Sequence, residues 1–457
     1  MRYTYPRFYR AVAGAAGLRP GISRNEQGND MSVKIGLVGT GTVGGGCIDI
    51  IQKHAADFKR HYGVDLELVR VCSHNPEQAV AHGVDDIFTL DYQEIIADPE
   101  IDIVIELIGG TGVAHAVVAD ALRAGKNVVT ANKALMATVG EELFALADEA
   151  GVELMFEASV GGGIPIIDPM KHSLISNEVS SVMGIVNGTT NYMLTRIGED
   201  GLTYDAALKE AQELGFAEAN PTADVDGFDA AAKIAILASI AFNSRVVMDD
   251  VHAEGIRSIS PVDLKAAHDM GYAVKLLAIA HRLPEGIDVR VHPTMIPLTH
   301  QLAYVNGVDN AIYVTGDFVG ETMFFGPGAG SGPAASAVMG DVLEVARHIT
   351  LGIKPIVGCT CTDKLPLVSI DTLKTRYYIR LTVPDRAGVL GKVATAFANH
   401  AVSLRSVAQE GKAHNSSVEI ILLTHTACEK DIREALEELG EMPDMLVTAP
   451  TLIRVED

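Results

Sequence analysis

Short, continuous apolar runs alternate with amphipathic stretches through the first part of the chain. Apolar runs of strand length lie at 33–38, 66–71 and 101–110, and others begin at 128 and 152. The stretches between them have apolar residues at helical spacing. Strands that alternate with helices predict a mostly parallel sheet with helices on both faces. We therefore expect an α/β domain over residues 31–160.

The pattern changes after about residue 165, where the apolar stretches become longer. Those with the character of antiparallel strands are 178–188, 288–298, 310–316 and 321–326. Those that favour helices are 204–215, 229–242 and 263–282. We expect an α+β domain over 161–325, built on an open sheet with helices on one face. A glycine-rich loop, a helix at 330–350 that returns to the first domain, and a linker follow over 326–375.

From Arg376 onward the chain has the order strand, helix, strand, strand, helix, strand. This βαββαβ order is the split motif of ferredoxin-like folds. The turn Asp385 to Gly388 comes immediately before the first helix of this unit, and a helix N-terminus suits the carboxylate of an amino acid. We expect residues 376–457 to form a small third domain.

Composition narrows the possible partners. The 457 residues carry a formal net charge of −23, which argues against nucleic acid and anionic membranes. No uncharged apolar run approaches the roughly 18 residues that span a bilayer. The 5 cysteines are scattered, and Cys359 and Cys361 lack further ligands at zinc spacing. We expect a soluble cytoplasmic protein whose residues 1–30 are a disordered or spurious extension, because Met31 immediately precedes the first strand.

The first apolar run is followed at once by a glycine-rich turn and a helix. The turn consists of Gly39, Thr40, Gly41, Thr42, Val43 and Gly44. In a strand, turn and helix context, the first glycine permits the tight turn and the second lets a pyrophosphate approach the backbone. The third lets the helix pack on the strand. The pattern predicts a Rossmann-type dinucleotide site with the phosphates at the positive end of the helix.

Residues near later strands also bear on the cofactor. Many NAD-binding domains have an acid after the second strand. This chain has Arg70 and Ser73 near that position, and these residues favour binding of the 2′-phosphate of NADP. Lys133 follows a strand at the sheet edge where ligands bind, so it is expected to face nicotinamide or substrate; a surface lysine is the alternative. The loop around Gly330 can approach a ligand closely.

The stretch from Gly215 to Lys233 carries the candidate chemistry. Its carboxylates, with one just upstream, are Glu213, Glu218, Asp224, Asp226 and Asp229. Asp229 precedes Lys233 by four positions, so both lie on one face of a helix that starts near Phe228. Among Ala, Ile and Leu the ammonium is shielded from water and needs an anionic partner. A structural ion pair and a general acid steered by carboxylates are both compatible with these residues.

Two polar turns also have alternative interpretations. The turn Val186 to Tyr192 opens a helix, and it is either a capping turn or a surface that presents polar groups, such as Thr190, to a small ligand. The bend Gly161 to Pro165 follows Glu157, and it is either a packing turn or a site where oxygens hold Na⁺ or K⁺.

Four segments together resemble the homoserine dehydrogenase family, of the monofunctional type with a C-terminal ACT domain. They are GLVGTGTVGGG (36–46), TANKAL (130–135), GIVNGTTNYML (184–194) and GFAEANPTADVDGFDAAAK (215–233), and the similarity covers about 31–457. The resemblance implies an NAD(P)-dependent oxidoreductase. Its reaction is the reversible reduction of L-aspartate 4-semialdehyde to L-homoserine, in threonine, methionine and isoleucine biosynthesis.

The resemblance also implies roles for individual residues. Lys233 donates the proton to the carbonyl oxygen, Lys133 lies at cofactor and substrate, and these two with Asp229 are the catalytic residues. Glu218 and Asp229 hold the substrate, with Asp224 beside them. The residues implied to coordinate sodium are Glu157, Val160, Gly162 and Ile164. Phe216 departs from the tyrosine found in a number of members, so a hydrogen bond from that hydroxyl is missing.

The terminal unit resembles an ACT domain, a small-amino-acid sensor in many enzymes. We expect threonine to bind as an effector at an interface between two ACT domains, near Asp385, Gly388, Val389 and Leu390. Exposed strands of the middle domain are expected to pair across a two-fold axis, which gives a homodimer or homotetramer.

Two other classes of function are compatible with parts of this pattern. A ligand sensor that kept both binding domains without catalysis has no use for Glu218, Asp229 and Lys233 together, which argues against it. A dehydrogenase of another amino acid, such as aspartate, is separated by comparing substrates with one cofactor.

Overall fold

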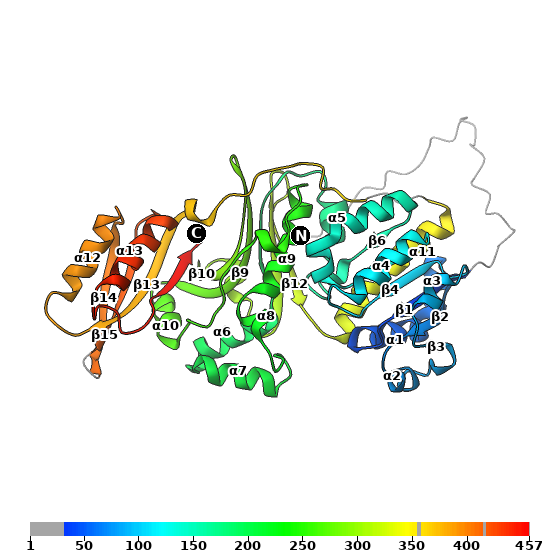
Figure 1. Ribbon diagram of the computed structural model, residues 1–457, viewed down its shortest axis with the longest axis horizontal. Helices are drawn as coiled ribbons and strands as arrows, with labels where there is room; N and C mark the ends of the chain where they lie inside the picture. The colour runs from blue at the N-terminus through cyan, green and yellow to red at the C-terminus, as the bar shows by residue number, and fades with distance from the viewer. Residues whose placement is uncertain (1–31, 354–357, 415–416, 457) are drawn as a thin grey trace, which may run out of the picture.

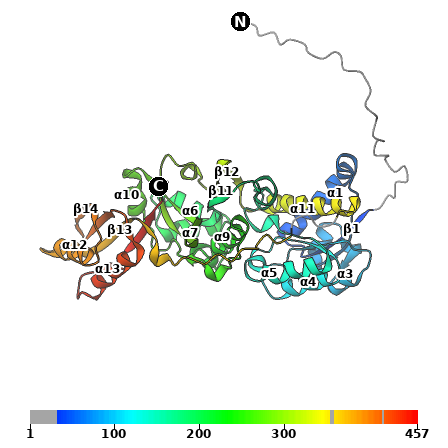
Figure 2. The same ribbon diagram turned by 90° about the horizontal axis from the view of Figure 1, so that it is seen from above.

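Three units follow one another along the molecule. The computed structural model describes residues 32–353, 358–414 and 417–456. Figure 1 shows a nucleotide-binding unit at one end, a central unit of long strands, and a small unit of strands and helices at the other end. Figure 2 shows the same order from above, so the units lie in a row. The extension expected at 1–30 lies outside the described residues.

The first unit is a six-stranded parallel sheet in the order β3-β2-β1-β4-β5-β6. Its strands are β1 (Val33–Val38), β2 (Leu66–Cys72), β3 (Phe88–Thr89), β4 (Ile103–Glu106), β5 (Asn127–Thr130) and β6 (Leu154–Met155). Its helices are α1 (Thr42–Asp57), α2 (Pro76–Ala81), α3 (Gln93–Ala97), α4 (Val113–Arg123) and α5 (Lys133–Ala150). The parallel order confirms the predicted Rossmann-type fold.

A helix from beyond the central unit completes the first unit. The buried Ala335 and Val338 of α11 (Ser331–Leu351) share an apolar cluster with Ile35 and Leu37 of β1. Figure 1 shows α11, in yellow, against the nucleotide-binding unit. The loop before α11 is thereby carried from the central unit to the glycine turn.

The central unit is a mostly antiparallel sheet covered by helices. Its strands are β7 (Val179–Ile185), β8 (His252–Ala253), β9 (Tyr272–Leu283), β10 (Gly286–Pro297), β11 (Asp309–Gly316) and β12 (Gly320–Pro327). Its helices are α6 (Gly188–Asp200), α7 (Tyr204–Glu213), α8 (Thr222–Val225), α9 (Phe228–Ala241) and α10 (Pro261–Asp269). Nearly all of α9 is buried, which explains its sequence of small and apolar residues.

One predicted helix is wrong. The stretch 263–282 is expected to be a single helix, but α10 ends at Asp269 and β9 begins at Tyr272. Gly271 lies between them with a φ of +88°, a conformation that ends a helix. β9 lies between β7 and β10 and is apolar on both faces. The alternation that identifies a half-buried strand is therefore missing.

The third unit has the predicted βαββαβ order. Its elements are β13 (Lys374–Pro384), α12 (Val389–Asn399), β14 (Leu404–His414), β15 (Ser417–Thr424), the short β16 (Ala427–Cys428), α13 (Glu429–Glu441) and β17 (Thr451–Val455). Residues of α12 and α13 form one apolar core with these strands. This arrangement confirms the predicted ferredoxin-like unit.

The sheets of the second and third units are continuous. β17 pairs in parallel with β10, so the strand order runs from β10 to β17 and on to β13. The sequence pattern predicts two separate domains, whereas main-chain hydrogen bonds between β10 and β17 join their sheets. Each sheet brings an edge strand, and pairing the two edges satisfies N–H and C=O groups that would otherwise need water.

Three further observations concern membrane-spanning helices, disulfide bonds and metal-binding groups. Within the described ranges, no helix combines the length and apolar character that crossing a membrane requires. All five cysteines are free. Across residues 32–353, 358–414 and 417–456, His, Cys, Asp and Glu form no group of three or more that could hold a metal ion.

Candidate active site

A cavity of about 540 Å³ lies between the nucleotide-binding and central units. It is lined by the start of α1, the start of α5, the turns that open α6 and α9, and the loop before α11. Cavities of this size bind small molecules and cofactors. Open α/β sheets bind ligands beyond the carboxyl ends of their strands, and the cavity lies at that edge.

The glycine turn between β1 and α1 has the geometry that a pyrophosphate needs. Gly39 has a φ of +105°, which favours glycine. A Cβ on Gly44 would lie 1.9 Å from the carbonyl oxygen of Gly39, whereas a Cβ on Gly41 would meet no atom within 4 Å. Thr42 and Val43, the first residues of α1, line the cavity. The turn therefore fits a dinucleotide, whose phosphates would meet the N–H groups that begin α1.

Gly330 and Arg70, which were also predicted to bind the cofactor, have different surroundings. Gly330 lines the cavity with a φ of +124°. Its neighbour Ser331 donates a hydrogen bond to the carbonyl oxygen of Thr42 at 2.7 Å, which attaches the loop before α11 to the glycine turn. Arg70 on β2 is partly exposed, and its Nη1 donates to Oε2 of Glu94 at 2.9 Å. It lies outside the lining of the cavity.

Lys233 lies in the polar part of the cavity and is only 8% exposed. Its ammonium donates to the main-chain oxygen of Val186 at 2.6 Å and to Oδ2 of Asp229 at 2.8 Å. Lys133 binds the other oxygen of the same carboxylate, with 3.1 Å between Nζ and Oδ1. The structure thus brings together the three residues predicted to be catalytic, two from α9 and one from the first turn of α5.

Asn187 connects the acids of this cluster, although no site role was predicted for it within the polar turn Val186 to Tyr192. Its Nδ2 donates to Oδ1 of Asp224 at 2.7 Å and to Oδ2 of Asp229 at 2.9 Å. Its Oδ1 accepts from the N–H of Thr190 at 2.9 Å, so the same side chain caps α6. An Asn before a helix start signals the cap. Its second role needs the two acids, which only the fold brings to it.

The two acids differ in their affinity for protons. Burial acts to raise the pKa of Asp229, but the charges of Lys233 and Lys133 outweigh it and hold the pKa below its ordinary value. For Asp224, burial raises the pKa despite the hydrogen bond from Asn187, and the nearby charge of Asp229 adds to the rise. Asp229 therefore stays ionised to a lower pH than an ordinary aspartate, whereas Asp224 takes up a proton more readily.

Two predicted substrate residues lie outside the cavity lining. Glu218 is exposed on the loop before α8. Thr190 is buried, and its hydroxyl donates back to Oδ1 of Asn187 at 2.8 Å. Its neighbour Thr189 lines the cavity instead. The structure does not bring Glu218 and Thr190 into the lysine–carboxylate cluster, and their contacts with a substrate stay a prediction.

Phe216, where a hydroxyl was expected to be missing, lines the cavity. Its ring packs edge-on against Tyr192, with centroids 5.0 Å apart. The Tyr192 hydroxyl donates to the carboxylate of Glu210. The Tyr192 hydroxyl is therefore bonded to Glu210, outside the cluster of Lys133, Asp229 and Lys233.

The bend after β6 uses its carboxylate within the chain. Oε1 of Glu157 accepts hydrogen bonds from the N–H groups of Ile166 and Ile167 at 2.6 and 2.9 Å, and Oε2 accepts from that of Asp168 at 2.6 Å. Burial raises the pKa of Glu157, and these three hydrogen bonds oppose that rise. Both carboxylate oxygens of Glu157 therefore bind main-chain N–H groups of residues 166–168.

The turn that opens α12 lies far from this cavity, in the third unit. Gly388 caps the helix with a φ of +90°. Asp385 and Leu390 are exposed, and Val389 is buried in the core of the unit. The turn presents one carboxylate and the first N–H groups of an 11-residue helix to the surface.

The fold and the cavity together define an NAD(P)-dependent oxidoreductase. A parallel sheet supplies a glycine turn that fits a dinucleotide, and the adjoining domain places a buried ammonium in the same cavity.

Comparison with known proteins identifies the family. Family models described as "Homoserine dehydrogenase, NAD binding domain", "Homoserine dehydrogenase" and "ACT domain" match residues 39–157, 165–343 and 377–444. A homoserine dehydrogenase of Synechocystis sp. is 44% identical over 434 residues, which cover 93% of this chain and 100% of the relative. One of Corynebacterium glutamicum is 41% identical over 452 residues, with 97% and 99% covered. The chain belongs to the homoserine dehydrogenase family.

Solved structures agree with this assignment. A homoserine dehydrogenase from Thiobacillus denitrificans matches with a TM-score of 0.87 and 39% identity, over 93% of this chain and 98% of that one. A hyperthermophilic archaeal homoserine dehydrogenase in complex with NADPH matches with a TM-score of 0.61 and 27% identity, over 72% and 100%. The family resemblance, the fold class and the class of enzyme predicted from sequence are confirmed.

Proposed function

We propose that this protein reversibly reduces L-aspartate 4-semialdehyde to L-homoserine, with NADPH or NADH, in threonine, methionine and isoleucine biosynthesis. The observation that carries the proposal is the buried Lys233 ammonium. It is paired with Asp229 in the cavity that the glycine turn also lines. The substrate carries an ammonium group. Carboxylates such as Asp224 suit that group better than neutral residues would.

The reaction needs an acid at the carbonyl oxygen, and Lys233 is that acid. Bound nicotinamide supplies the hydride that reaches the aldehyde carbon. As negative charge develops on the oxygen, Nζ of Lys233 stabilises it and donates a proton. Asp229 fixes the position of the ammonium, and Lys133 offsets the charge of Asp229 near the developing oxyanion. In the reverse direction the neutral amine of Lys233 accepts the hydroxyl proton.

The test of this function is turnover of the substrate by the purified protein. With L-homoserine and NADP⁺ or NAD⁺, we expect the absorbance of reduced nicotinamide to rise. L-aspartate and L-serine serve as control substrates, because they share the ammonium and carboxylate groups. Preferential turnover of aspartate, or no turnover of homoserine, would contradict the proposal.

We expect Asp224, as a ligand of the substrate ammonium, to make the KM for homoserine depend on pH. Its pKa is raised, so it is protonated at a higher pH than an ordinary aspartate. The KM should stay constant at mildly alkaline pH and rise as the pH falls through that pKa. Asp224→Asn should raise the alkaline KM about tenfold and remove the pH dependence.

Glu213→Gln is the matched control, because Glu213 is an exposed acid just upstream that pairs with Lys209 outside the cavity. Its KM should keep the wild-type value and pH profile. A wild-type profile in Asp224→Asn would exclude the ammonium role of Asp224.

We also propose that the enzyme favours NADP over NAD. Support comes from Arg70, a cation near the carboxyl end of β2 where many NAD-binding domains have an acid. A 2′-phosphate would compete with Glu94 for this guanidinium. Equal kcat/KM for NADP⁺ and NAD⁺ would remove the basis for a preference.

For the ACT domain we propose threonine as a feedback effector, bound near Asp385, Gly388, Val389 and Leu390 where two ACT domains meet. The exposed carboxylate of Asp385 and the adjoining helix start support an amino-acid site. Millimolar threonine should lower the rate and raise the midpoint of thermal unfolding, and Asp385→Ala should abolish both effects. No change in either quantity for the wild-type protein would end this proposal.

A sodium ion is proposed at the bend of Glu157, Val160, Gly162 and Ile164. Support comes from the glycines of the bend, because Gly161 and Gly162 have φ values of +73° and +59° and a backbone without side chains can expose its carbonyls. Replacing Na⁺ by a bulky organic cation should lower activity, and an unchanged rate would count against the ion.

A homodimer, or a tetramer built from dimers, is proposed through the edge of the central sheet. β12 is that edge, and Met323 and Phe325 on it are exposed, as is the nearby Phe318. Sedimentation as a monomer at micromolar concentration would exclude it.

A further inference from the structure

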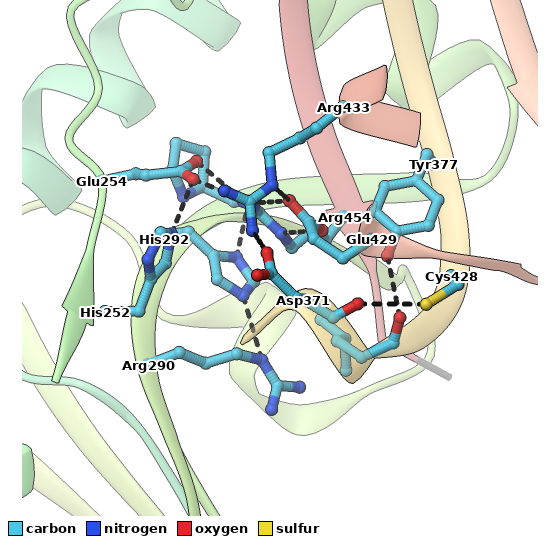
Figure 3. A network of polar contacts seen from close by, with 12 residues as sticks. His252, Glu254, Arg290, His292, Asp371, Tyr377, Cys428, Glu429, Arg433 and Arg454 are labelled. Carbon is cyan, nitrogen blue, oxygen red and sulfur yellow. Dashed lines mark hydrogen bonds and ion pairs between the residues drawn. The ribbon is translucent and has the colours of Figure 1, made fainter. Parts of the chain in front are cut away.

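Arg454 connects the ACT domain to the catalytic domain (Figure 3). It lies on β17, the last strand, and is 1% exposed. Its Nη1 and Nη2 donate to the carboxylate of Glu254 at 2.7 and 2.8 Å. Its Nε and Nη2 donate to the carboxylate of Glu429, at 2.8 and 2.5 Å. One buried guanidinium is therefore shared between a carboxylate of the catalytic domain and one that begins α13 of the ACT domain.

The geometry of these contacts fixes how the two carboxylates lie relative to Arg454. A guanidinium that binds a carboxylate through two N–H groups fixes its distance and its plane, which a lysine cannot do. His252 also contacts Glu254, with 2.7 Å between Nε2 and Oε1. The carboxylate of Glu254 is thus held on one side by its own domain and on the other by the ACT strand.

The backbone around Glu254 packs directly on another turn. The N–H of Ile256 donates to the carbonyl oxygen of Val225 at 2.9 Å. A Cβ on Gly255 would lie 1.9 Å from that same oxygen. A Cβ on Gly227 would lie 3.3 Å from the carbonyl oxygen of Glu254. The two backbones are in contact without space for a side chain, so a shift of one displaces the other.

The turn in question, residues 224–229, carries the groups to which we assign the substrate. Asp224 lies at its beginning, and Gly227 caps α9 just before Asp229. Lys233 follows one helical turn later. A displacement of the turn therefore changes the spacing between the ligand of the substrate ammonium and the proton donor.

We propose that Arg454 is a positioning residue for the catalytic site. Through Glu254 it fixes the turn 224–229, so that the position of the ACT strand β17 determines the affinity for the substrate. The inference rests on the proposed function, because that function assigns the substrate to this turn. It also gives an amino acid bound at the start of α12 a physical route to the active site through α13, Arg454 and Glu254, because α12 and α13 share one apolar core.

A second buried pair keeps the two domains together when Arg454 is changed. Arg380 of β13 donates from Nε and Nη2 to the carboxylate of Asp263 at 2.7 and 3.1 Å, and the Tyr378 hydroxyl donates to it at 3.0 Å. Asp263 lies in the first turn of α10, beyond the segment that contacts the turn 224–229. Variants of the Arg454 link therefore test positioning rather than detachment of the ACT domain.

The experiment measures steady-state kinetics of the full-length chain with homoserine and NADP⁺. Glu254→Gln places an amide NH₂ against a guanidinium donor and breaks the two-point contact. We expect its KM for homoserine to rise about five- to tenfold, as for other mutations along a coupling route. The KM for the nucleotide should stay within about twofold of the wild type, because the glycine turn belongs to the other unit. Arg454→Met should act in the same direction.

Glu429→Gln is the matched control. It removes the other carboxylate from the same guanidinium and loses stability by the same mechanism, but it leaves the contact with Glu254 in place. Thermal unfolding should show a lower midpoint, while the KM for homoserine should remain at the wild-type value. A rise restricted to Glu254→Gln and Arg454→Met supports the proposal.

An equal rise in Glu429→Gln would overturn the inference, because a loss of stability would then explain every variant. An unchanged KM in Glu254→Gln would overturn it as well. Turnover of homoserine by the wild-type chain is measured first, so an active wild type with an unaffected Glu254→Gln variant contradicts this inference and leaves the proposed function intact.

Discussion

Replacing Lys233 by alanine is expected to lower kcat for homoserine oxidation about 10³-fold, because proton transfer and stabilisation of the developing oxyanion are lost together. The substitution also removes the hydrogen bonds to Val186 and Asp229. Lys133 still neutralises the Asp229 carboxylate, so the fold should persist. Steady-state kinetics and thermal unfolding of the same preparation measure the two effects separately.

Lys126→Met provides the control for a buried lysine without a catalytic role. Lys126 is 5% exposed in the nucleotide-binding unit, and its Nζ donates to the main-chain oxygens of Asp98 and Ile101 at 2.5 and 2.8 Å. This variant should lose stability and keep its kcat. A Lys233→Ala protein that keeps both its fold and its kcat would leave the proton donor unassigned.

The parts of the site that the sequence predicts depend on local geometry. Asp229 and Lys233 lie four residues apart on one helix, and a helix start near Phe228 is enough to bring them together. Lys133 follows from the rule that ligands bind beyond the carboxyl ends of parallel strands. Neither prediction needs the relative placement of the two domains.

Asn187 shows what local reasoning cannot supply. Its contacts with Asp224 and Asp229 span 37 and 42 residues, so they exist only after β7 and α9 have been placed beside each other. The opposite case is Thr190, whose hydroxyl turns back and donates to the Asn187 side chain that caps the same helix. A polar turn at a helix start can point either way, and the sequence does not determine which residue faces the cavity.

The same distinction applies to the fold. The alternation of strands and helices predicts the Rossmann-type unit, and the order of elements predicts the ferredoxin-like unit. β9 was predicted as a helix because a strand buried on both faces has no alternation of apolar and polar residues. The pairing of β17 with β10 was not foreseen, because neither strand alone encodes which edge it will meet.

Two substitutions in the glycine turn test where the cofactor phosphates bind. A Cβ on Gly41 meets no protein atom within 4 Å, so Gly41→Ala should unfold at the wild-type temperature. If the pyrophosphate lies against this backbone, the added methyl group displaces it. We expect the KM for the nucleotide to rise about 100-fold, the order of loss that a misplaced reactant causes.

Gly44→Ala separates this effect from damage to the turn. Its Cβ would lie 1.9 Å from the carbonyl oxygen of Gly39, so the turn itself must move, and both stability and nucleotide binding should fall. Calorimetric titration with NADP⁺ and thermal unfolding of the two variants measure both quantities. A Gly41→Ala protein that binds the nucleotide as tightly as the wild type would place the phosphates away from this turn. The nicotinamide would then have no defined position beside the substrate at Lys233.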